Sequence, residues 1–337
     1  MKKEVPAYLP DVVPSFLEEA FFLKALTRLK HVGMHCGLEY SSFPYFQSVL
    51  PYSRYQHSLG CALLAYRFSN DSKIALAAAF HDVATPVFAH VIDFLRGDYE
   101  KQDATEAPTS ALIRNDEEVM AYLERHHLRV EDVEDYHRYP IADNDAPELS
   151  CDRLEYSLSN FLNFHVLSLN EVKGLLDDLC LEKNEFGEEE IMFSSLESAS
   201  KFGEAMLVNA DMYTRNEDRF AMEALSRAIA EALRKGDLNE SDLMEDEVIF
   251  LKKWLSSPSA HLFKTYQRLY QVTTSPKPGI EPLFSAKIKT KKRYIDPYVK
   301  GKGRLSSLSI DFKRKLLEFL QKDFDETLYG YVLEEGI

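Results

Sequence analysis

Apolar residues recur three and four positions apart along almost the whole chain, and this spacing puts them on one face of successive α-helices. The pattern is clear in the segments HSLGCALLAYRF, SKIALAAAFHD, ELSCDRLEYSLSNFLNF and SASKFGEAMLVNADMY. Helix starts are predicted at Asn70-Asp71 and at Thr85-Pro86, and Gly97 predicts a helix end. The sequence therefore predicts a mostly α-helical protein in which short connections join the helices.

Two segments lack the helical period and predict short β-strands. Residues 179–193 predict a hairpin around Gly187, and residues 284–295 predict a short ribbon. After about residue 195 the chain reads as long helices, with no further cluster of His and carboxylate residues that suggests chemistry. We therefore expect an N-terminal unit of residues 1–195, with its core at about 20–165, and a helical C-terminal region of residues 196–337 that packs on it.

Charge and composition limit the class of partner. The chain has 337 residues, of which 45% are hydrophobic, and this is enough for a sizeable core. A formal net charge of −15 disfavours binding to nucleic acid and to anionic membranes. The chain has no apolar run of the length that spans a membrane and no signal-peptide centre, so we expect a cytoplasmic location. The four cysteines form no CxxC pair, which is typical of reduced, buried thiols and argues against a thiolate zinc site.

One segment is strongly basic. Residues 287–304, KIKTKKRYIDPYVKGKGR, contain many Lys and Arg residues and a single acidic residue, Asp296. Such a run is most often a solvated loop or hairpin. The alternative is a patch that binds phosphate, because an anionic substrate of an acidic protein needs a local concentration of positive charge.

A second feature is the pair His81-Asp82 at the end of a predicted buried helix. A lone pair of this kind is usually a cap or a surface pair, but burial of both groups is unfavourable unless they are paired or bind a metal. His57 lies in the first turn of the preceding predicted helix, so an antiparallel helix pair would bring it to the same end as His81. Asp152, at the start of another predicted helix, would close the site from a third side. Two imidazoles and two carboxylates predict a site for one divalent transition metal, Mn, Fe, Co, Ni or Zn.

Three motifs together resemble those of the HD-domain phosphohydrolases, and within them the deoxynucleoside triphosphate triphosphohydrolase branch. The motifs are RYQHSLG at 54–60, HDVATPVFAHVID at 81–93 and DRLEY at 152–156, and the segments LTRLKHVGMHCG and KRYIDPYV also resemble family segments. The resemblance covers residues about 20 to 160 well and the last third thinly. It implies an HD-domain helical bundle with additional C-terminal helices and one or two short β-hairpins. It also implies a homo-oligomer, because family members pair through helices that flank the site.

The resemblance implies a role for each matching residue. It assigns metal ligation to His57, His81, Asp82 and Asp152. It assigns contacts with substrate phosphate to Arg54, Arg153 and Tyr156, where an arginine supplies a fork of charge-assisted hydrogen bonds and a tyrosine its hydroxyl. It places His90 near the phosphates and makes Asp93 the carboxylate that orients a catalytic group.

The chain departs from the family pattern beside the metal. Thr85 replaces the second His of the H-D-x-x-H motif, and Thr105-Glu106 stands where the branch has a His-Glu pair. Asn160 replaces an Asp that lies near the sugar, so we expect it to contact substrate in a different way. The missing histidines would remove general acid assistance, which is worth about 10² to 10⁴ in rate. His90 and Glu106 are the candidates to replace it.

Three functions are compatible with these motifs. The first is a metal-dependent phosphohydrolase that acts through metal-activated water on a nucleotide or another small phosphorylated compound. The second is a catalytically weakened protein that serves as a metal-dependent ligand sensor or assembly subunit, which the replacements at Thr85 and Thr105 favour. The third is a di-iron oxygenase of the same superfamily, which would need additional histidine ligands. We favour the first, since four polar residues that are unfavourable to bury are kept together.

Overall fold

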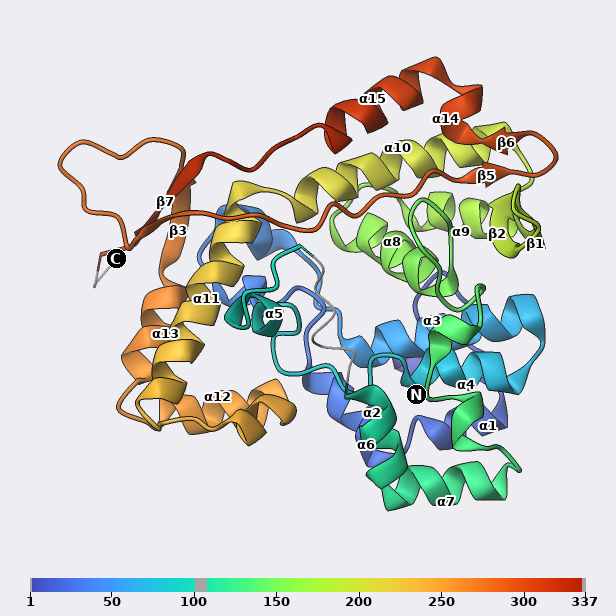
Figure 1. Ribbon diagram of the computed structural model, residues 1–337, viewed down its shortest axis with the longest axis horizontal. Helices are drawn as coiled ribbons and strands as arrows, with labels where there is room; N and C mark the ends of the chain where they lie inside the picture. Colours follow the sequence, from blue (N-terminus) through green and yellow to red (C-terminus); the bar gives the residue numbers. More distant parts are fainter. Residues whose placement is uncertain (1, 101–107, 335–337) are drawn as a thin grey trace.

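The computed structural model describes residues 2–100 and 108–334, and within them the chain is mostly helical, as the periodicity predicts (Figure 1). The α-helices are α1 (Ser15–Ala20), α2 (Lys24–Thr27), α3 (Arg54–Ser69), α4 (Ser72–Phe80), α5 (Val91–Leu95), α6 (Thr109–Asn115), α7 (Glu117–Arg125), α8 (Cys151–Asn163), α9 (Leu169–Asp177), α10 (Leu196–Tyr213), α11 (Asn216–Arg234), α12 (Glu247–Leu255), α13 (Ala260–Gln267), α14 (Leu305–Leu308) and α15 (Ile310–Leu320). The strands are β1 (Leu179–Lys183), β2 (Glu189–Phe193), β3 (Leu269–Thr273), β4 (Ser285–Lys287), β5 (Tyr298–Val299), β6 (Gly303–Arg304) and β7 (Thr327–Val332). Short 3-10 helices are η1 (Lys2–Glu4), η2 (Arg28–His31), η3 (Leu38–Tyr40), η4 (Pro44–Ser48), η5 (Val130–Asp132), η6 (Tyr136–Arg138) and η7 (Glu240–Met244).

Helices α3 and α4 form the pair that the sequence predicts, and local side chains fix its ends. Ser53 and Gln56 form a capping box at the start of α3, so two backbone N–H groups that have no partner within the helix are satisfied. Asn70 ends α3 in a left-handed conformation with φ of 51°, and Asp71 accepts a hydrogen bond from the Lys73 N–H to start α4. The tight connection brings the first turn of α3 next to the last turn of α4.

The predicted helix start at Pro86 is wrong, because helix α5 begins only at Val91. Phe88 and Ala89 have positive φ angles of 55° and 46°, which an α-helix does not allow. The intervening residues form turns that bury both side chains in the hydrophobic core. The predicted end is confirmed, since Gly97 follows α5 with a φ of 77°.

Two small sheets lie at opposite ends of the molecule, with β3 and β7 in one and β1, β2, β5 and β6 in the other (Figure 1). The hairpin predicted at 179–193 is confirmed: β1 and β2 pair antiparallel from Leu179 with Phe193, and Gly187 lies in the turn with a φ of 82°. The ribbon predicted at 284–295 is wrong. Only β4 forms a strand there, and it pairs antiparallel with β7, so its partner lies far along the chain. From residue 288 to 297 the backbone runs on without strand pairing until β5 joins β2 in parallel.

The basic segment 287–304 is not a uniformly solvated loop. Its outer lysines are exposed, but Ile288, Thr290 and Ile295 are buried and anchor the backbone. At its end Arg304 forms two ion-pair contacts of 2.6 and 2.7 Å with the fully buried Glu190 of β2. The segment is therefore held along its length against the rest of the protein.

Two large hydrophobic clusters form the core. One gathers residues from Val5 to Phe193 together with side chains of α10, α15 and β5, and the other joins residues 36–94 to α11, α12, α13 and β7. Both clusters thus contain residues from either side of position 195, and the division into residues 1–195 and 196–337 stays a prediction. None of the helices within the described ranges is both long and apolar enough to cross a lipid bilayer.

Candidate functional site

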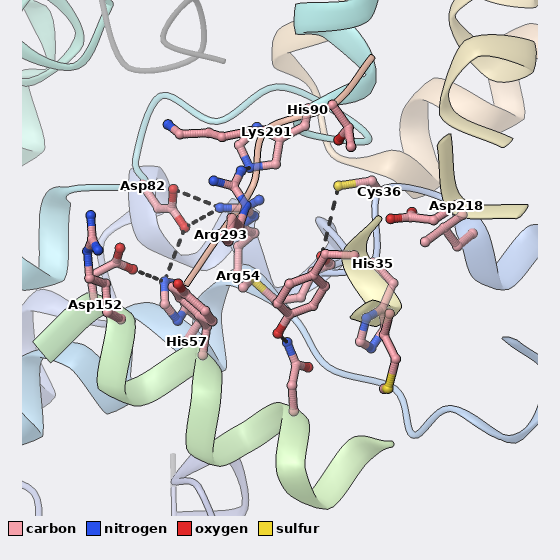
Figure 2. A pocket seen from close by; sticks show the side chains of 18 of the residues that line it. His35, Cys36, Arg54, His57, Asp82, His90, Asp152, Asp218, Lys291 and Arg293 are labelled. Atoms are coloured by element: carbon pink, nitrogen blue, oxygen red, sulfur yellow. Dashed lines mark hydrogen bonds and ion pairs between the residues drawn. The ribbon is translucent and has the colours of Figure 1, made fainter. Parts of the chain in front are cut away.

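The predicted metal ligands meet at one end of a pocket of about 260 Å³ that is lined by residues from both halves of the chain (Figure 2). His57 comes from the first turn of α3, His81 directly follows α4, and Asp152 comes from the first turn of α8. Because α3 and α4 are antiparallel neighbours and α8 packs across α3, three separate elements bring these side chains together.

The donor atoms are spaced as ligands of a single ion. The Nε2 atoms of His57 and His81 are 3.2 Å apart, and Asp152 Oδ1 lies 3.0 Å from the first and 3.6 Å from the second. Asp82 Oδ2 lies 3.8 and 3.5 Å from the same two nitrogens. Tetrahedral ligands at about 2.1 Å from a metal are about 3.4 Å apart. These residues therefore fit the metal that the sequence predicts, and ligation by all four stays a prediction.

Cys61 also lies in this cluster, although the sequence analysis interpreted it as a reduced, buried thiol and not as a metal ligand. Its thiol, together with His57, His81 and Asp152, makes a group of possible ligands whose donor atoms lie within 4.8 Å of one another. The Cys61 Sγ is 3.7 Å from both ring nitrogens of His57, so it lies beside the ring and not beyond Nε2. Burial also raises the pKa of the Cys61 thiol above its usual range, which disfavours the thiolate. We therefore assign the fourth position to Asp82.

Both histidines are held with Nε2 toward the site. His81 Nδ1 is 2.7 Å from the Ala78 carbonyl oxygen, to which it donates. His57 Nδ1 is 2.5 Å from Oε2 of Glu155, a fully buried carboxylate. Glu155 lies one turn after Asp152 in the DRLEY motif, so its position on the same face of α8 was a signal that sequence reasoning missed.

The Glu155 carboxylate is itself held by hydroxyl groups. Its Oε1 accepts hydrogen bonds from Tyr8 at 2.8 Å and Ser159 at 2.7 Å, and also from Tyr52. Gly60 of α3 makes room for it, since a Cβ there would lie 2.6 Å from the Glu155 Cγ. A carboxylate that accepts from a ligating imidazole fixes the ring orientation and raises the basicity of the ring. This network completes the local support of the metal ligands.

Two side chains hold Asp82: Arg54 from the start of α3, and Thr85 from the same motif as Asp82. Arg54 Nη1 lies 3.0 and 2.7 Å from the two carboxylate oxygens, and the Thr85 hydroxyl donates to Oδ1 at 2.8 Å. Although burial alone would raise it, the Arg54 guanidinium keeps the pKa of the Asp82 carboxyl well below its usual range. Thr85 thus orients a ligand at the position where the family has a histidine. Among the atoms that the structure describes, the buried Arg54 Nε has no hydrogen-bond partner.

His90 and Asp93 lie together at the edge of the pocket. His90 Nδ1 is 2.9 Å from Asp93 Oδ2, and His90 Nε2 is 3.1 Å from Arg293 Nη2. Burial lowers the pKa of His90 to about 4, so the ring is neutral at neutral pH. Its Nε2 then accepts from Arg293 while its Nδ1 donates to Asp93, which suits a group that orients an arginine better than one that donates a proton.

Three more of the predicted residues, Arg153, Tyr156 and Asn160, also line the pocket. Arg153 and Tyr156 line it from α8, with Arg153 Nε 3.8 Å from the Asp143 carboxylate. Asn160 lies farther along the same helix, and its amide nitrogen donates to the Tyr213 hydroxyl at 2.8 Å. Their contacts with substrate stay predictions. Glu106 lies outside the described residues, as does the adjacent Thr105.

Sequence reasoning placed no residue of the C-terminal region in this pocket, although it gave a phosphate-binding patch in residues 287–304 as the alternative to a solvated loop. Lys291 and Arg293 of the basic segment line it beside Asp82 and Arg54, and Asp218 from the first turn of α11 lines it at a distance from the metal ligands (Figure 2). The excess of Lys and Arg in residues 287–304 was the available signal for a phosphate-binding patch. No local pattern marked Asp218.

Comparison with known proteins supports the motif analysis. Residues 54–154 match the HD domain family. The chain is 25% identical over 293 residues to the uncharacterised protein YdhJ of Bacillus subtilis, which covers 84% of this chain and 86% of that protein. A crystal structure of a phosphohydrolase from Bacteroides thetaiotaomicron has the same fold, with a TM-score of 0.62 at 16% identity over 96% of this chain and 97% of that one. A hypothetical protein from Aquifex aeolicus is similar, with a TM-score of 0.59 at 16% identity over 95% and 93% of the two chains.

Proposed function

Since the chain carries an HD domain at residues 54–154, we propose that it is a metal-dependent phosphohydrolase acting on a small phosphorylated compound, with nucleotides among the candidates. One divalent transition metal, Mn, Fe, Co, Ni or Zn, would be held by His57, His81, Asp82 and Asp152. The observation that carries the proposal is the convergence of these four donor groups, 3.0 to 3.8 Å apart in the pairs measured, beside arginines that line the same pocket.

The residues around the donors suit a phosphate group. When bound, a divalent metal supplies Lewis acidity that lowers the pKa of water and polarises a phosphoryl oxygen. Arg54, Arg153 and Arg293 line the pocket and present guanidinium groups to the same space. Guanidinium groups bind phosphate oxygens through charge-assisted hydrogen bonds. These cations compensate locally for the net negative charge of the protein.

The side chains that could donate a proton limit which substrates the site can hydrolyse quickly. His90 is neutral and engaged by Arg293, and Thr85 has no titratable group at neutral pH. A leaving group that needs protonation would therefore depart slowly, since general acid assistance is worth about 10² to 10⁴ in rate. We expect slow hydrolysis of ordinary deoxynucleoside triphosphates. Asn160 points the same way, because an amide replaces the carboxylate that the family has near the sugar.

The test combines metal analysis with a phosphate-release screen. Purified wild type and His57→Ala are each loaded with Mn, Fe, Co, Ni or Zn and assayed on nucleoside triphosphates, nucleoside monophosphates and sugar phosphates. We expect one metal ion per wild-type chain, metal-dependent release of phosphate from one of these classes, and neither property in His57→Ala. Equal turnover by His57→Ala would contradict the metal-dependent mechanism.

A second candidate is a ligand sensor that binds a phosphorylated compound without turnover. It is favoured by the neutral His90 and by Thr85, because neither side chain is available to protonate a leaving group. Saturable, metal-dependent binding of a phosphate compound with no product after prolonged incubation would establish this alternative. We also expect a homo-oligomer in the cytoplasm, and light scattering that shows a dilute monomer would contradict the assembly.

A further inference from the structure

The pocket has a second polar end, away from the metal ligands. Asp218 lines it from the first turn of α11 and is 6% exposed, and Figure 2 shows it on the opposite side of the pocket from Asp152 and His57. A buried carboxyl usually has partners, because its transfer from water without hydrogen bonds is unfavourable. In the described ranges no hydrogen bond or ion pair satisfies the Asp218 side chain, and burial raises the pKa of this carboxyl to about 8.

The nearest cations are committed to other groups. Arg219, the next residue, turns away from the pocket and contacts the Ile288 carbonyl, the Asn216 side chain and Glu326. Arg293 reaches the Asp218 region electrostatically, but its Nη2 bonds to His90. Asp218 also makes no cap contact at the start of α11, where no side chain caps the helix. No hydrogen bond or ion pair among the described residues therefore satisfies the Asp218 carboxyl group.

The pocket lining also contains apolar and aromatic side chains. They include Phe46, Phe164, Met212, Met222 and Tyr213. Thioether and aromatic groups pack well against the faces of a ring. At neutral pH a carboxyl group with a pKa of about 8 is mostly protonated and offers a phosphate no positive charge, so this end does not suit a second phosphate. The pocket thus has cations beside the candidate metal ligands and an unsatisfied carboxyl group at the other end, with apolar side chains in its lining.

We propose that Asp218 binds an amino or imino N–H group on a ring in the organic part of the substrate, and so fixes which end of the substrate faces the metal. This specificity rests on the proposed function, because it takes the phosphate to lie beside the metal ligands. The two natural sources of this chemistry are an amino-bearing nucleobase and an amino sugar. In either case the substrate N–H donates to a carboxyl oxygen of Asp218, and loss of that hydrogen bond leaves the buried carboxyl group without a partner and weakens binding by about tenfold.

The experiment uses matched pairs of non-hydrolysable phosphonates, in which a methylene group replaces the ester oxygen. One pair is the guanosine and inosine 5′-phosphonates, which differ by a 2-amino group, and the other is the 6-phosphonates of glucosamine and 2-deoxyglucose. Binding to the full-length, metal-loaded protein is measured by calorimetry, with inorganic phosphate as a third probe. The variants are Asp218→Ala and Asp218→Asn, and the matched control is Glu217→Gln, which removes the charge of an adjacent residue that does not line the pocket.

We expect the wild type and Glu217→Gln to bind the amino member of one pair about tenfold or more tightly than its partner, and Asp218→Ala to bind both members equally. The pair that is discriminated identifies the nucleobase or the amino sugar. If the wild type discriminates neither pair, or if Asp218→Ala discriminates as the wild type does, the assignment is wrong.

Inorganic phosphate separates this inference from the proposed function. We expect it to bind the wild type and all variants with the same affinity, because Asp218 lies away from the phosphate end. Failure of phosphate to bind the wild type would contradict the proposed function, whereas normal phosphate binding without discrimination contradicts only the role of Asp218. Should Asp218→Ala fail to fold, Asp218→Leu keeps the side-chain size without an acceptor and decides by the same comparison, whereas Asp218→Asn, which keeps an acceptor oxygen, should still discriminate.

Discussion

Arg293 Nη2 lies 3.1 Å from Nε2 of His90, so a histidine of the HD domain and an arginine 203 residues later in the chain meet in the same pocket. Because His90 is neutral, it accepts this hydrogen bond while Asp93 holds its other nitrogen. The three side chains form a relay from a buried carboxylate to a cation. Its geometry indicates that the region matching the HD domain family holds the basic segment in place as well as the candidate metal ligands.

Replacing Arg293 should separate phosphate binding from metal binding. We expect Arg293→Gln to weaken inorganic phosphate binding by about tenfold or more, since a charge-assisted hydrogen bond is worth about 1.5 to 3 kcal/mol. The metal content should not change, because Arg293 is not one of the four assigned ligands. Calorimetry with phosphate and metal analysis on the same sample provide the two measurements. Loss of metal together with phosphate binding would show that the segment supports the ligands.

Glu155→Gln should weaken the metal site without removing a ligand. An amide is a poorer acceptor for the His57 Nδ1–H, and loss of such a supporting carboxylate typically costs about 10- to 100-fold in metal affinity. Competition with a chelator of known affinity measures the change. Cys61→Ser is the matched control from the same cluster, and we expect it to keep wild-type affinity because Cys61 Sγ lies beside the His57 ring. The reverse ranking of the two variants would assign the fourth ligand to Cys61.

Arg304→Ala should destabilise the fold. Glu190 is fully buried, and loss of its two contacts with Arg304 would leave a buried carboxylate without its cation. Breaking a buried ion pair in this way costs about 3 to 5 kcal/mol in the free energy of unfolding. Urea denaturation of the variant measures it. The exposed pair of Lys300 with Glu182 serves as the control, and Lys300→Ala should change the unfolding free energy by less than about 1 kcal/mol.

Asp218 should make stability depend on pH. Burial raises its pKa in the folded state to about 8, whereas the unfolded chain has the ordinary value near about 3.9. The folded protein therefore binds the proton more tightly, and its stability falls as the pH rises from about 4 to about 8. Asp218→Asn removes this loss, so it should be more stable than the wild type by at least about 1.4 kcal/mol at pH 9, with the difference shrinking at low pH. Unfolding curves across this range decide, and a difference independent of pH would contradict the assignment.

Local sequence could predict that the candidate metal ligands lie close together, because the helices that carry His57 and His81 are fixed by local interactions. The capping residues Ser53 and Asp71, the helical period and the position of His81 all lie within one helix pair. Glu155 was equally visible in the spacing of its motif but was not selected. The helix start at Pro86 could not be predicted, because the turns at Phe88 and Ala89 are stabilised by packing in a core built largely from later residues.

The other end of the pocket depends on contacts that no short segment encodes. Strand β4 pairs with β7, and the chain after it is anchored by buried Ile288 and Ile295 before Arg304 meets Glu190. Only this path brings Lys291 and Arg293 to the HD site. Asp218 comes from the start of a long helix in which it looks like any acidic residue of a first turn. Only the folded structure shows that Asp218 is buried without a hydrogen bond or an ion pair among the described residues.

The position of Arg293 near the end of the chain has a consequence for synthesis of the protein. A ribosome releases α3, α4 and α8, with all four assigned metal ligands, well before it translates Asp218, Lys291 or Arg293. A nascent chain therefore holds the groups for acquiring metal before it has the groups that grip and orient a substrate. Products of premature termination between α8 and the basic segment would share this state, with the four candidate ligands present and an unfinished pocket around them.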